Sequence, residues 1–138
     1  MFHRIRFAPV ACASLILALF VAGCGGDGPE RGAVSGKVTL DGEPLEGADV
    51  EFQPEAGSPS YGTTDRKGKY DLMYTRDKRG AMIGVHTVRI TTSTTGTDGQ
   101  GNQTAVPQRV PPKYNSQSEL KTEVKPGRNK VDFELKQP

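Results

Sequence analysis

The chain has 138 residues, with 18 Lys and Arg against 16 Asp and Glu and a net charge of +2. This length leaves room for one domain. Both excess basic residues, Arg4 and Arg6, lie among the first 23 residues, which contain no acidic residue. The rest of the chain is therefore balanced, with 16 basic and 16 acidic residues. Because no basic field remains there, we expect no nucleic-acid partner.

Residues 1–23 have the pattern of an export signal. His3, Arg4 and Arg6 form a short positive region, and the uncharged run from Ala8 to Gly23 is mostly apolar. A run of this length is short for a transmembrane helix, which needs about 20 apolar residues. An uncleaved signal anchor is the rival interpretation, and the two glycines at 25 and 26 directly after the run disfavour it.

Val21-Ala22-Gly23-Cys24 resembles the bacterial lipobox, in which a branched apolar residue and two small residues precede a cysteine. The resemblance implies diacylglyceryl transfer to the Cys24 thiol and cleavage between Gly23 and Cys24. Two acyl chains anchor a protein stably in a membrane. Cys12 would leave with residues 1–23, so the mature chain would keep one cysteine and form no internal disulfide. The alternative is a free cysteine at a flexible end.

The residues after Cys24 set the expected boundaries. Residues 24–32 are rich in glycine and have little to bury, which is typical of a flexible tether. Residues 33–138 are expected to form the folded domain. Gly25 stands where an aspartate would indicate retention in the inner membrane of some bacteria, so we expect an exported, outer-membrane protein of the cell envelope.

From Ala33 the apolar residues recur at every second position, the pattern of strands with one buried face. The first half of the domain contains strands over 33–40 and 48–53, a short extended stretch over 60–64, and a strand around 70–72. Gly36 takes an inward position, where we expect a neighbour to approach closely. Asp41-Gly42 and Asp65-Arg66-Lys67-Gly68 are typical turns.

The second half begins with a strand over 85–90, in which His86, Val88 and Ile90 share a face. Residues 91–108 are mostly Thr, Ser, Gly, Gln and Asn, which predicts a long mobile loop. Order resumes at 110–115, and alternating segments around 120–125 and 130–136 complete the domain. About seven short strands with no helix after the signal predict an all-β, antiparallel sandwich.

Several motifs of the domain are similar to one family. Val34 to Ala48 resembles the opening of carboxypeptidase regulatory-like domains, and Thr64 to Tyr70 resembles their middle turn. Pro112 to Asn115 and Val124 to Asn129 resemble the single-domain lipoproteins of planctomycete-type bacteria. The resemblance implies a transthyretin-like, immunoglobulin-like sandwich of seven antiparallel strands without catalytic machinery. His86 departs from the pattern, because the family usually has an aromatic residue there.

The candidates for chemistry are few. His86 is the only histidine after residue 23, so a catalytic dyad or a histidine metal site lacks partners, and a core histidine is the favoured interpretation. Asp65 and Asp98 stand in turn contexts, and at Asp65 the cations Arg66 and Lys67 occupy positions where calcium would need oxygen ligands. We therefore expect no catalytic, cofactor-binding or metal-binding residue.

The four tyrosines permit two interpretations: a ligand-binding face, or core residues with hydrated hydroxyls. They are Tyr61, Tyr70, Tyr74 and Tyr114.

These features bear on three possible functions. The leading one is a non-enzymatic, lipid-anchored envelope protein that contacts another protein through a sheet edge or residues 91–108. The alternative is a carrier or sensor for a small lipid or glycan ligand. An enzyme resembling hydroxyisourate hydrolases is disfavoured, because those have several histidines and end in Tyr-Arg-Gly-Ser, whereas this chain ends at Gln137-Pro138.

Overall fold

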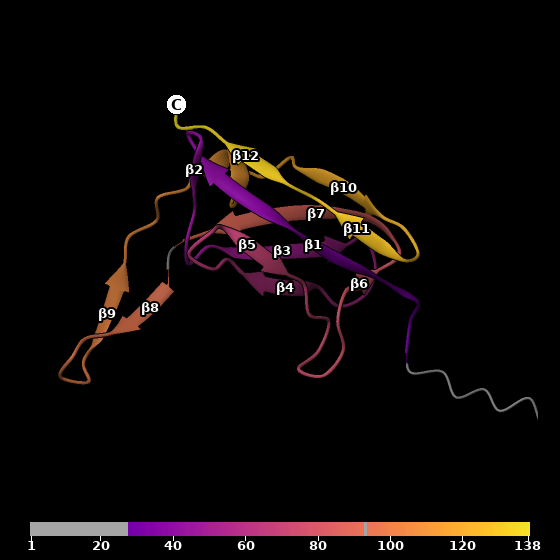
Figure 1. Cartoon of the computed structure of the whole chain (residues 1–138), viewed down its shortest axis with the longest axis horizontal. Coiled ribbons are helices and arrows are strands. Elements are labelled where there is room, and N and C mark those ends of the chain that lie inside the picture. The colour runs from indigo at the N-terminus through magenta and orange to yellow at the C-terminus, as the bar shows by residue number, and fades with distance from the viewer. Residues whose placement is uncertain (1–27, 93) are drawn as a thin grey trace, which may run out of the picture.

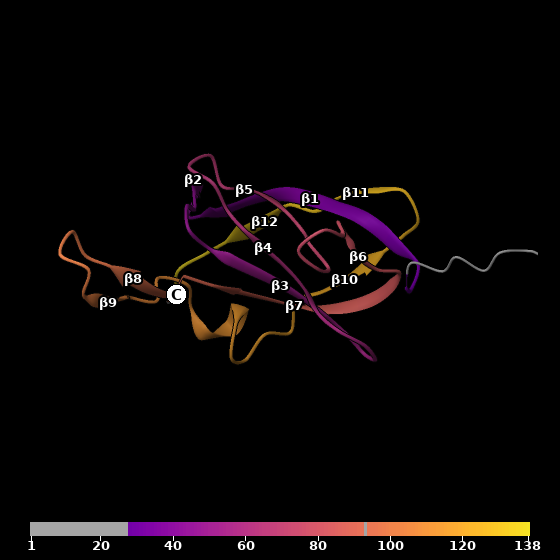
Figure 2. The same cartoon turned by 90° about the horizontal axis from the view of Figure 1, so that it is seen from below.

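The computed structural model describes residues 28–92 and 94–138. These residues form two β-sheets that face each other, with β1 and β5 in one layer and β3 and β7 in the other (Figure 2). The predicted β-sandwich is confirmed. The predicted signal peptide and the lipidation site at Gly23 and Cys24 lie outside the described residues. Within the described ranges, no helix has the length and apolar character to cross a membrane.

The first sheet has six strands, the second four, and a separate hairpin two. The first sheet contains β1 (Arg31–Leu40), β2 (Glu43–Pro44), β5 (Lys69–Asp71), β6 (Ala81–Met82), β11 (Arg128–Lys130) and β12 (Phe133–Leu135). The second contains β3 (Asp49–Pro54), β4 (Ser60–Thr63), β7 (Gly84–Thr91) and β10 (Lys121–Val124), in the order β10-β7-β3-β4. The hairpin is β8 (Thr94–Thr97) and β9 (Gln103–Val106), and a single turn of 3-10 helix, η1, spans Pro112–Tyr114.

β1 is the central strand of the first sheet and pairs with all five other strands (Figure 1). Its pairing with β2, β5 and β6 is antiparallel, but its pairing with β11 and β12 is parallel. The expectation of purely antiparallel sheets is therefore wrong at this point. The first and last strands are joined through the whole domain, so no hairpin dictates their relative direction.

β1 begins at Arg31, two residues before the expected start of the domain. Gly32 is buried there, and a Cβ atom on it would lie 2.1 Å from the carbonyl oxygen of Lys125. The last two residues assigned to the tether are thus part of the sheet, because their backbone pairs with β6.

The core lies between the two sheets and is formed by the alternating residues that the sequence pattern singles out. Val38, Val50, Phe52, Val88 and Ile90 are fully buried. Phe52 is at the centre, with its ring 6.2 Å from that of Phe133 in an edge-on arrangement. Burial of each such large side chain contributes about 1.5–3 kcal/mol of the transfer free energy that drives folding.

Gly36 confirms the expected close approach. A Cβ atom at this position would lie 1.7 Å from the carbonyl oxygen of Val131, so only glycine fits. The same carbonyl accepts a hydrogen bond of 2.6 Å from the Tyr70 hydroxyl. Burial of that hydroxyl, with Asp132 nearby, raises the pKa of Tyr70 above its ordinary value. Gly36 therefore lets the last strand segment reach β1 and Tyr70.

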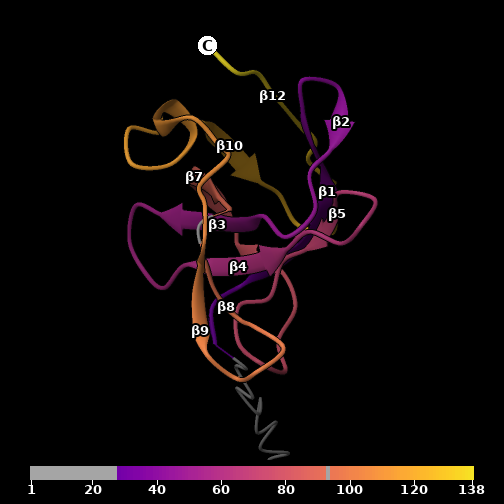
Figure 3. The ribbon, with the colours of Figure 1, turned by 90° about the vertical axis from the view of Figure 1, so that its left-hand side faces the viewer.

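The predicted loop over residues 91–108 is wrong, because the segment contains the β8–β9 hairpin. The hairpin lies beyond the sandwich, at the end opposite the start of β1 (Figures 1 and 3). Thr97 on β8 and residues 103–105 on β9 are exposed, and neither strand shows apolar alternation in the sequence. Asp98 forms the turn: its carboxylate accepts the backbone N–H groups of Gln100 and Asn102 at 2.9 and 2.8 Å.

Candidate functional site

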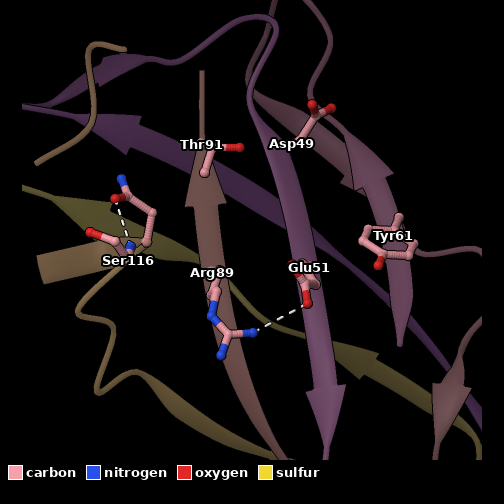
Figure 4. Close-up of a pocket in the computed structure, with 7 residues that line it drawn as sticks. Asp49, Glu51, Tyr61, Arg89, Thr91 and Ser116 are labelled. Atoms are coloured by element: carbon pink, nitrogen blue, oxygen red, sulfur yellow. Dashed lines mark hydrogen bonds and ion pairs between the residues drawn. The ribbon is translucent and has the colours of Figure 1, made fainter. Parts of the chain in front are cut away.

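An open depression of about 550 Å³ lies on the outer face of the four-stranded sheet (Figure 4). The outward residues of three neighbouring strands line it: Asp49 and Glu51 from β3, Tyr61 from β4, and Arg89 and Thr91 from β7. These positions alternate with the buried core residues of the same strands. The apolar alternation that builds the core therefore also brings this polar set together on the other face.

Glu51 is the central residue of the depression. In the sheet register it lies opposite Tyr61 on one side and Arg89 on the other. Arg89 Nη1 donates a hydrogen bond of 3.2 Å to Glu51 Oε1 (Figure 4). The two side chains remain 41% and 27% exposed, so the ion pair contributes at most about 1 kcal/mol to stability. Its main effect is to hold the guanidinium group next to Glu51, which lies between Arg89 and Tyr61 in the sheet.

A second polar pair extends the depression along β3. Thr63 Oγ1 donates a hydrogen bond of 2.8 Å to Asp49 Oδ1, and Asp49 also lies opposite Thr91. Asp49 and Glu51 are thus bonded to Thr63 and Arg89, and both residues remain partly exposed. Together with Arg89 and Tyr61 they offer acceptors, a donor group and an aromatic ring to a ligand.

The remaining wall comes from the segment after η1. Asn115 is buried, and its Nδ2 donates to the carbonyl oxygens of Ile90, Val110 and Pro111 at 3.2–3.3 Å. Its Oδ1 accepts the backbone N–H of Ser116 at 2.7 Å. Asn115 is therefore a structural residue that ties this segment to β7 and holds Ser116 at the rim.

The structure separates the four tyrosines. The Tyr70 hydroxyl is bonded in the core, the Arg31 guanidinium lies 5.4 Å from the centre of the Tyr74 ring, and the Tyr114 hydroxyl accepts the backbone N–H of Lys136 at 3.0 Å. Only Tyr61 lies in the depression, where it is 52% exposed. A binding face built from all four tyrosines is therefore wrong, and Tyr61 alone contributes an aromatic surface to this site.

His86 is a core residue, as expected. It is 1% exposed, and its ring centre lies 5.7 Å from that of Phe52. Nε2 is 2.7 Å from the carbonyl oxygen of Met82, which can only accept, so Nε2 carries the proton. Nδ1 is buried without a partner in the described part of the chain. The ring faces the core and not the depression, so it offers no base to a ligand bound there.

Asp65 and Asp98 have the same structural role in two turns. Asp65 Oδ1 accepts the backbone N–H groups of Lys69 and Lys67 at 2.9 and 2.8 Å, an arrangement that matches the bonds at Asp98. The bond from Lys69 is the largest cause that holds the pKa of Asp65 below its usual value; at Asp98 the backbone N–H of Asn102 does the same. In residues 28–92 and 94–138, no three His, Cys, Asp or Glu side chains are grouped to hold a metal ion.

Apart from Tyr61, sequence reasoning missed the residues that line the depression. Glu51 and Arg89 are 38 positions apart in the chain, and nothing in either strand alone indicates that β3 pairs with β7. The available signal was indirect: Asp49, Glu51 and Arg89 stand at outward positions of strands whose inward positions are apolar.

No family model matches the chain, and no curated protein matches its sequence. Similar solved structures include the major pilin subunit of Bacillus cereus, with 16% identity and a TM-score of 0.45, which covers 78% of this chain and 30% of the pilin. A 9R-lipoxygenase from Cyanothece PCC8801 has 16% identity and a TM-score of 0.44, with 78% of this chain and 16% of the enzyme covered. A DUF3823 family protein from Parabacteroides merdae has 15% identity and a TM-score of 0.41, with 78% and 47% covered. This chain spans less than half of each of these three proteins, and at these TM-scores the likenesses carry no functional argument.

Proposed function

We propose that the protein is a non-enzymatic, lipid-anchored protein of the cell envelope, whose β-sandwich contacts a protein partner through the depression around Tyr61. The lipobox resemblance at Cys24 and the resemblance to carboxypeptidase regulatory-like domains support the location and the class. The single observation behind the contact site is Tyr61, which is 52% exposed beside the Arg89–Glu51 pair.

Residue type and position both favour a protein contact there. Tyrosine and arginine are enriched among the residues that dominate binding energy at protein interfaces. A rigid sheet holds both side chains, so little conformational entropy is lost when a partner binds. The edge of β4 is a poorer docking site at this point, because Tyr61 already exchanges two backbone hydrogen bonds with Met73, at 3.0 and 2.8 Å.

The anchor is tested by mass spectrometry of the N-terminus of the native protein. The expected result is a mature chain that begins at Cys24 and carries acyl groups, and a Cys24→Ser variant that accumulates as the uncleaved precursor. An intact Met1, or an unmodified Cys24, would contradict the anchor.

The contact site is tested with native-envelope extracts applied to the immobilised mature chain, followed by quantification of each bound protein. Tyr61→Ser should reduce the bound amount of a specific partner at least tenfold. The matched control is Val85→Ser, because Val85 is 44% exposed on the same sheet but does not line the depression. Equal loss with both variants, or with neither, would refute the site.

A small-ligand carrier or sensor is the second candidate, and the same depression favours it. Its volume of about 550 Å³ is within the range of small-molecule sites, and an exposed tyrosine beside carboxylates and a guanidinium suits stacking and hydrogen bonding to a glycan. A thermal-shift screen with glycans and lipids distinguishes the two functions. A shift that Tyr61→Ser abolishes would favour the ligand, and no shift would favour the protein partner.

A further inference from the structure

Five basic side chains gather on the outer face of β5, β1 and β11 and on the segment between β5 and β6, on the opposite side of the sandwich from the depression around Tyr61. They are Lys37, Lys69, Arg79, Arg128 and Lys130, and all five are exposed. We call them the basic face. Two aspartates, Asp71 and Asp132, lie among them, so positive charges exceed negative ones by three.

The register of the sheet forces like charges together. Lys37 on β1 and Lys69 on β5 are direct partners in the antiparallel ladder. Such residues have Cβ atoms about 4.5–5.5 Å apart, and like charges at this spacing destabilise a sheet. Lys130 on β11 lies opposite Ser35, two positions before Lys37. A third lysine is therefore added beside a pair that already repels.

The fold does not neutralise these cations. The ion pairs Arg66–Glu46 and Arg89–Glu51 in the described part of the chain do not involve the basic face. The Asp132 carboxylate is directed to the backbone, where Oδ1 accepts the N–H of Lys37 at 2.8 Å. Glu134 lies on β12, opposite Thr39 of β1, and lines neither of the two depressions beside these cations.

The basic face is hollowed as well as charged. Arg79 and Arg128 line a depression of about 280 Å³, and the three lysines line another of about 360 Å³. Ser35 and Asp71 belong to both, so the two depressions adjoin. Groups of the size of a phosphate can therefore enter between the cations.

We propose that the basic face binds the anionic headgroups of a lipid bilayer, so that the sandwich lies on the membrane with this sheet downward. Charge complementarity is the first argument, since each basic residue near an anionic bilayer contributes to binding and residues 24–138 as a whole are neutral. The second argument is continuity: the basic face is built around β1, the first strand after the proposed anchor at Cys24.

The dimensions permit this orientation. Cys24 and Arg31 are seven positions apart, and an extended chain of this length reaches about 25 Å. With the basic face on the bilayer, the depression around Tyr61 is directed away from the membrane, where a partner can reach it. The inference rests on the proposed location in the cell envelope. The binding of headgroups by the domain is nevertheless measured without the acyl anchor on Cys24.

The experiment uses residues 25–138, since every buried core residue lies between Val34 and Leu135. Sedimentation with vesicles of phosphatidylglycerol and phosphatidylcholine should show binding that phosphatidylcholine vesicles alone do not give and that 0.5 M KCl abolishes. The triple variant Lys37→Gln/Lys69→Gln/Lys130→Gln should lower the partition coefficient about a hundredfold, since each basic residue contributes about fivefold.

The matched control removes the same charge from three exposed lysines that line neither depression: Lys113→Gln/Lys121→Gln/Lys125→Gln. It should stay within about fivefold of the parent chain. Circular dichroism checks that both triple variants are folded, and the single variant Lys37→Gln, expected about fivefold weaker, serves if the triple variant unfolds.

Absence of binding to the anionic vesicles, or equal loss with both triple variants, would overturn the proposal. A further arm replaces chloride with inorganic phosphate at equal ionic strength. The proposal expects no difference, whereas stronger displacement by phosphate would show a discrete phosphate site and would overturn the bilayer as the ligand. Because residues 25–138 carry no acyl group, failure here leaves the mass-spectrometric test of Cys24 unaffected.

Discussion

Thr92 and Gln108 close the base of the β8–β9 hairpin. The Gln108 Oε1 atom accepts the backbone N–H of Thr92 at 2.9 Å and lies 3.0 Å from the Thr92 hydroxyl. The same Oε1 accepts the N–H of Val110, while the Thr92 oxygen accepts the N–H of Arg109 at 2.6 Å. The two ends of the hairpin are therefore joined through side chains, at the point where it leaves the sandwich.

Thr92→Val should destabilise the domain. Valine keeps the shape of the buried side chain, but the Arg109 N–H loses its acceptor, which costs about 1–3 kcal/mol in the free energy of unfolding. Urea denaturation measures this change. The control is Thr97→Val, an exposed residue of the hairpin, which should remain within about 0.5 kcal/mol of the parent. If Thr92→Val lowers the free energy of unfolding by less than about 0.5 kcal/mol, the structural role of the hydroxyl is contradicted.

Two serines should respond to alanine with opposite signs. The Ser60 hydroxyl is buried without a partner in the described residues, so Ser60→Ala should raise the free energy of unfolding by about 1 kcal/mol. The Ser118 hydroxyl donates to the Val88 carbonyl and accepts the N–H of Leu120, so Ser118→Ala should lower it by a similar amount. Thermal unfolding of the two variants, measured side by side, tests these opposite signs. A loss of stability in Ser60→Ala would show that the Ser60 hydroxyl has a hydrogen-bond partner.

Gly36→Ala should prevent the last strand segments from pairing with β1. The added methyl group would overlap the Val131 carbonyl, and backbone cannot yield as a flexible side chain does. We expect a loss of at least about 3 kcal/mol, in the range of severe overpacking and broken networks. Ser35→Ala is the neighbouring control, since Ser35 is exposed. If Gly36→Ala unfolds at the same urea concentration as Ser35→Ala, the close approach is not present in solution.

Acid stability should depend on Asp65 and Asp98. Backbone N–H groups favour the charged carboxylates, so the folded-state pKa values lie below the unfolded value of about 3.9. Groups with a depressed pKa contribute stability that is present above the unfolded value and is lost as the pH falls through the folded value. Asp65→Asn and Asp98→Asn should therefore flatten the dependence of unfolding free energy on pH below about 4.

Urea titrations between pH 2 and pH 6 give that dependence. Glu55→Gln is the control, because Glu55 is exposed and accepts no backbone N–H in the described part of the chain. Equal flattening in the control would mean that general charge repulsion, and not the two turns, sets the acid response.

The sequence alone was sufficient for the core and for several turns. Val50 and Phe52, or Val88 and Ile90, are buried because their alternation leaves one face of each strand apolar, and that information is local. Gly36 and the Asp65 turn were also local predictions, since each depends on what a single residue type permits in the backbone.

What the sequence did not show depends on which distant strands become neighbours. The strands of the hairpin over 94–106 show no apolar alternation in the sequence, and the Asp98-Gly99 turn was the local signal for them. The Glu51–Arg89 pair and the Lys37–Lys69 repulsion exist only through the pairing of β3 with β7 and of β1 with β5. Neither the candidate site nor the basic face could be located before that pairing was known.

The parallel pairing of β1 with the last two strands also times the folding of the chain. The Lys37 N–H can bond to the Asp132 carboxylate only after the chain has been made as far as Asp132, 95 positions later. At about 5–20 residues per second of synthesis, this delay is about 5–20 seconds. A chain that emerges from the ribosome with its N-terminus first has β1 without its parallel partners β11 and β12 for that time. The first sheet is therefore complete only when the last eleven residues, 128–138, have been made and can pair with β1.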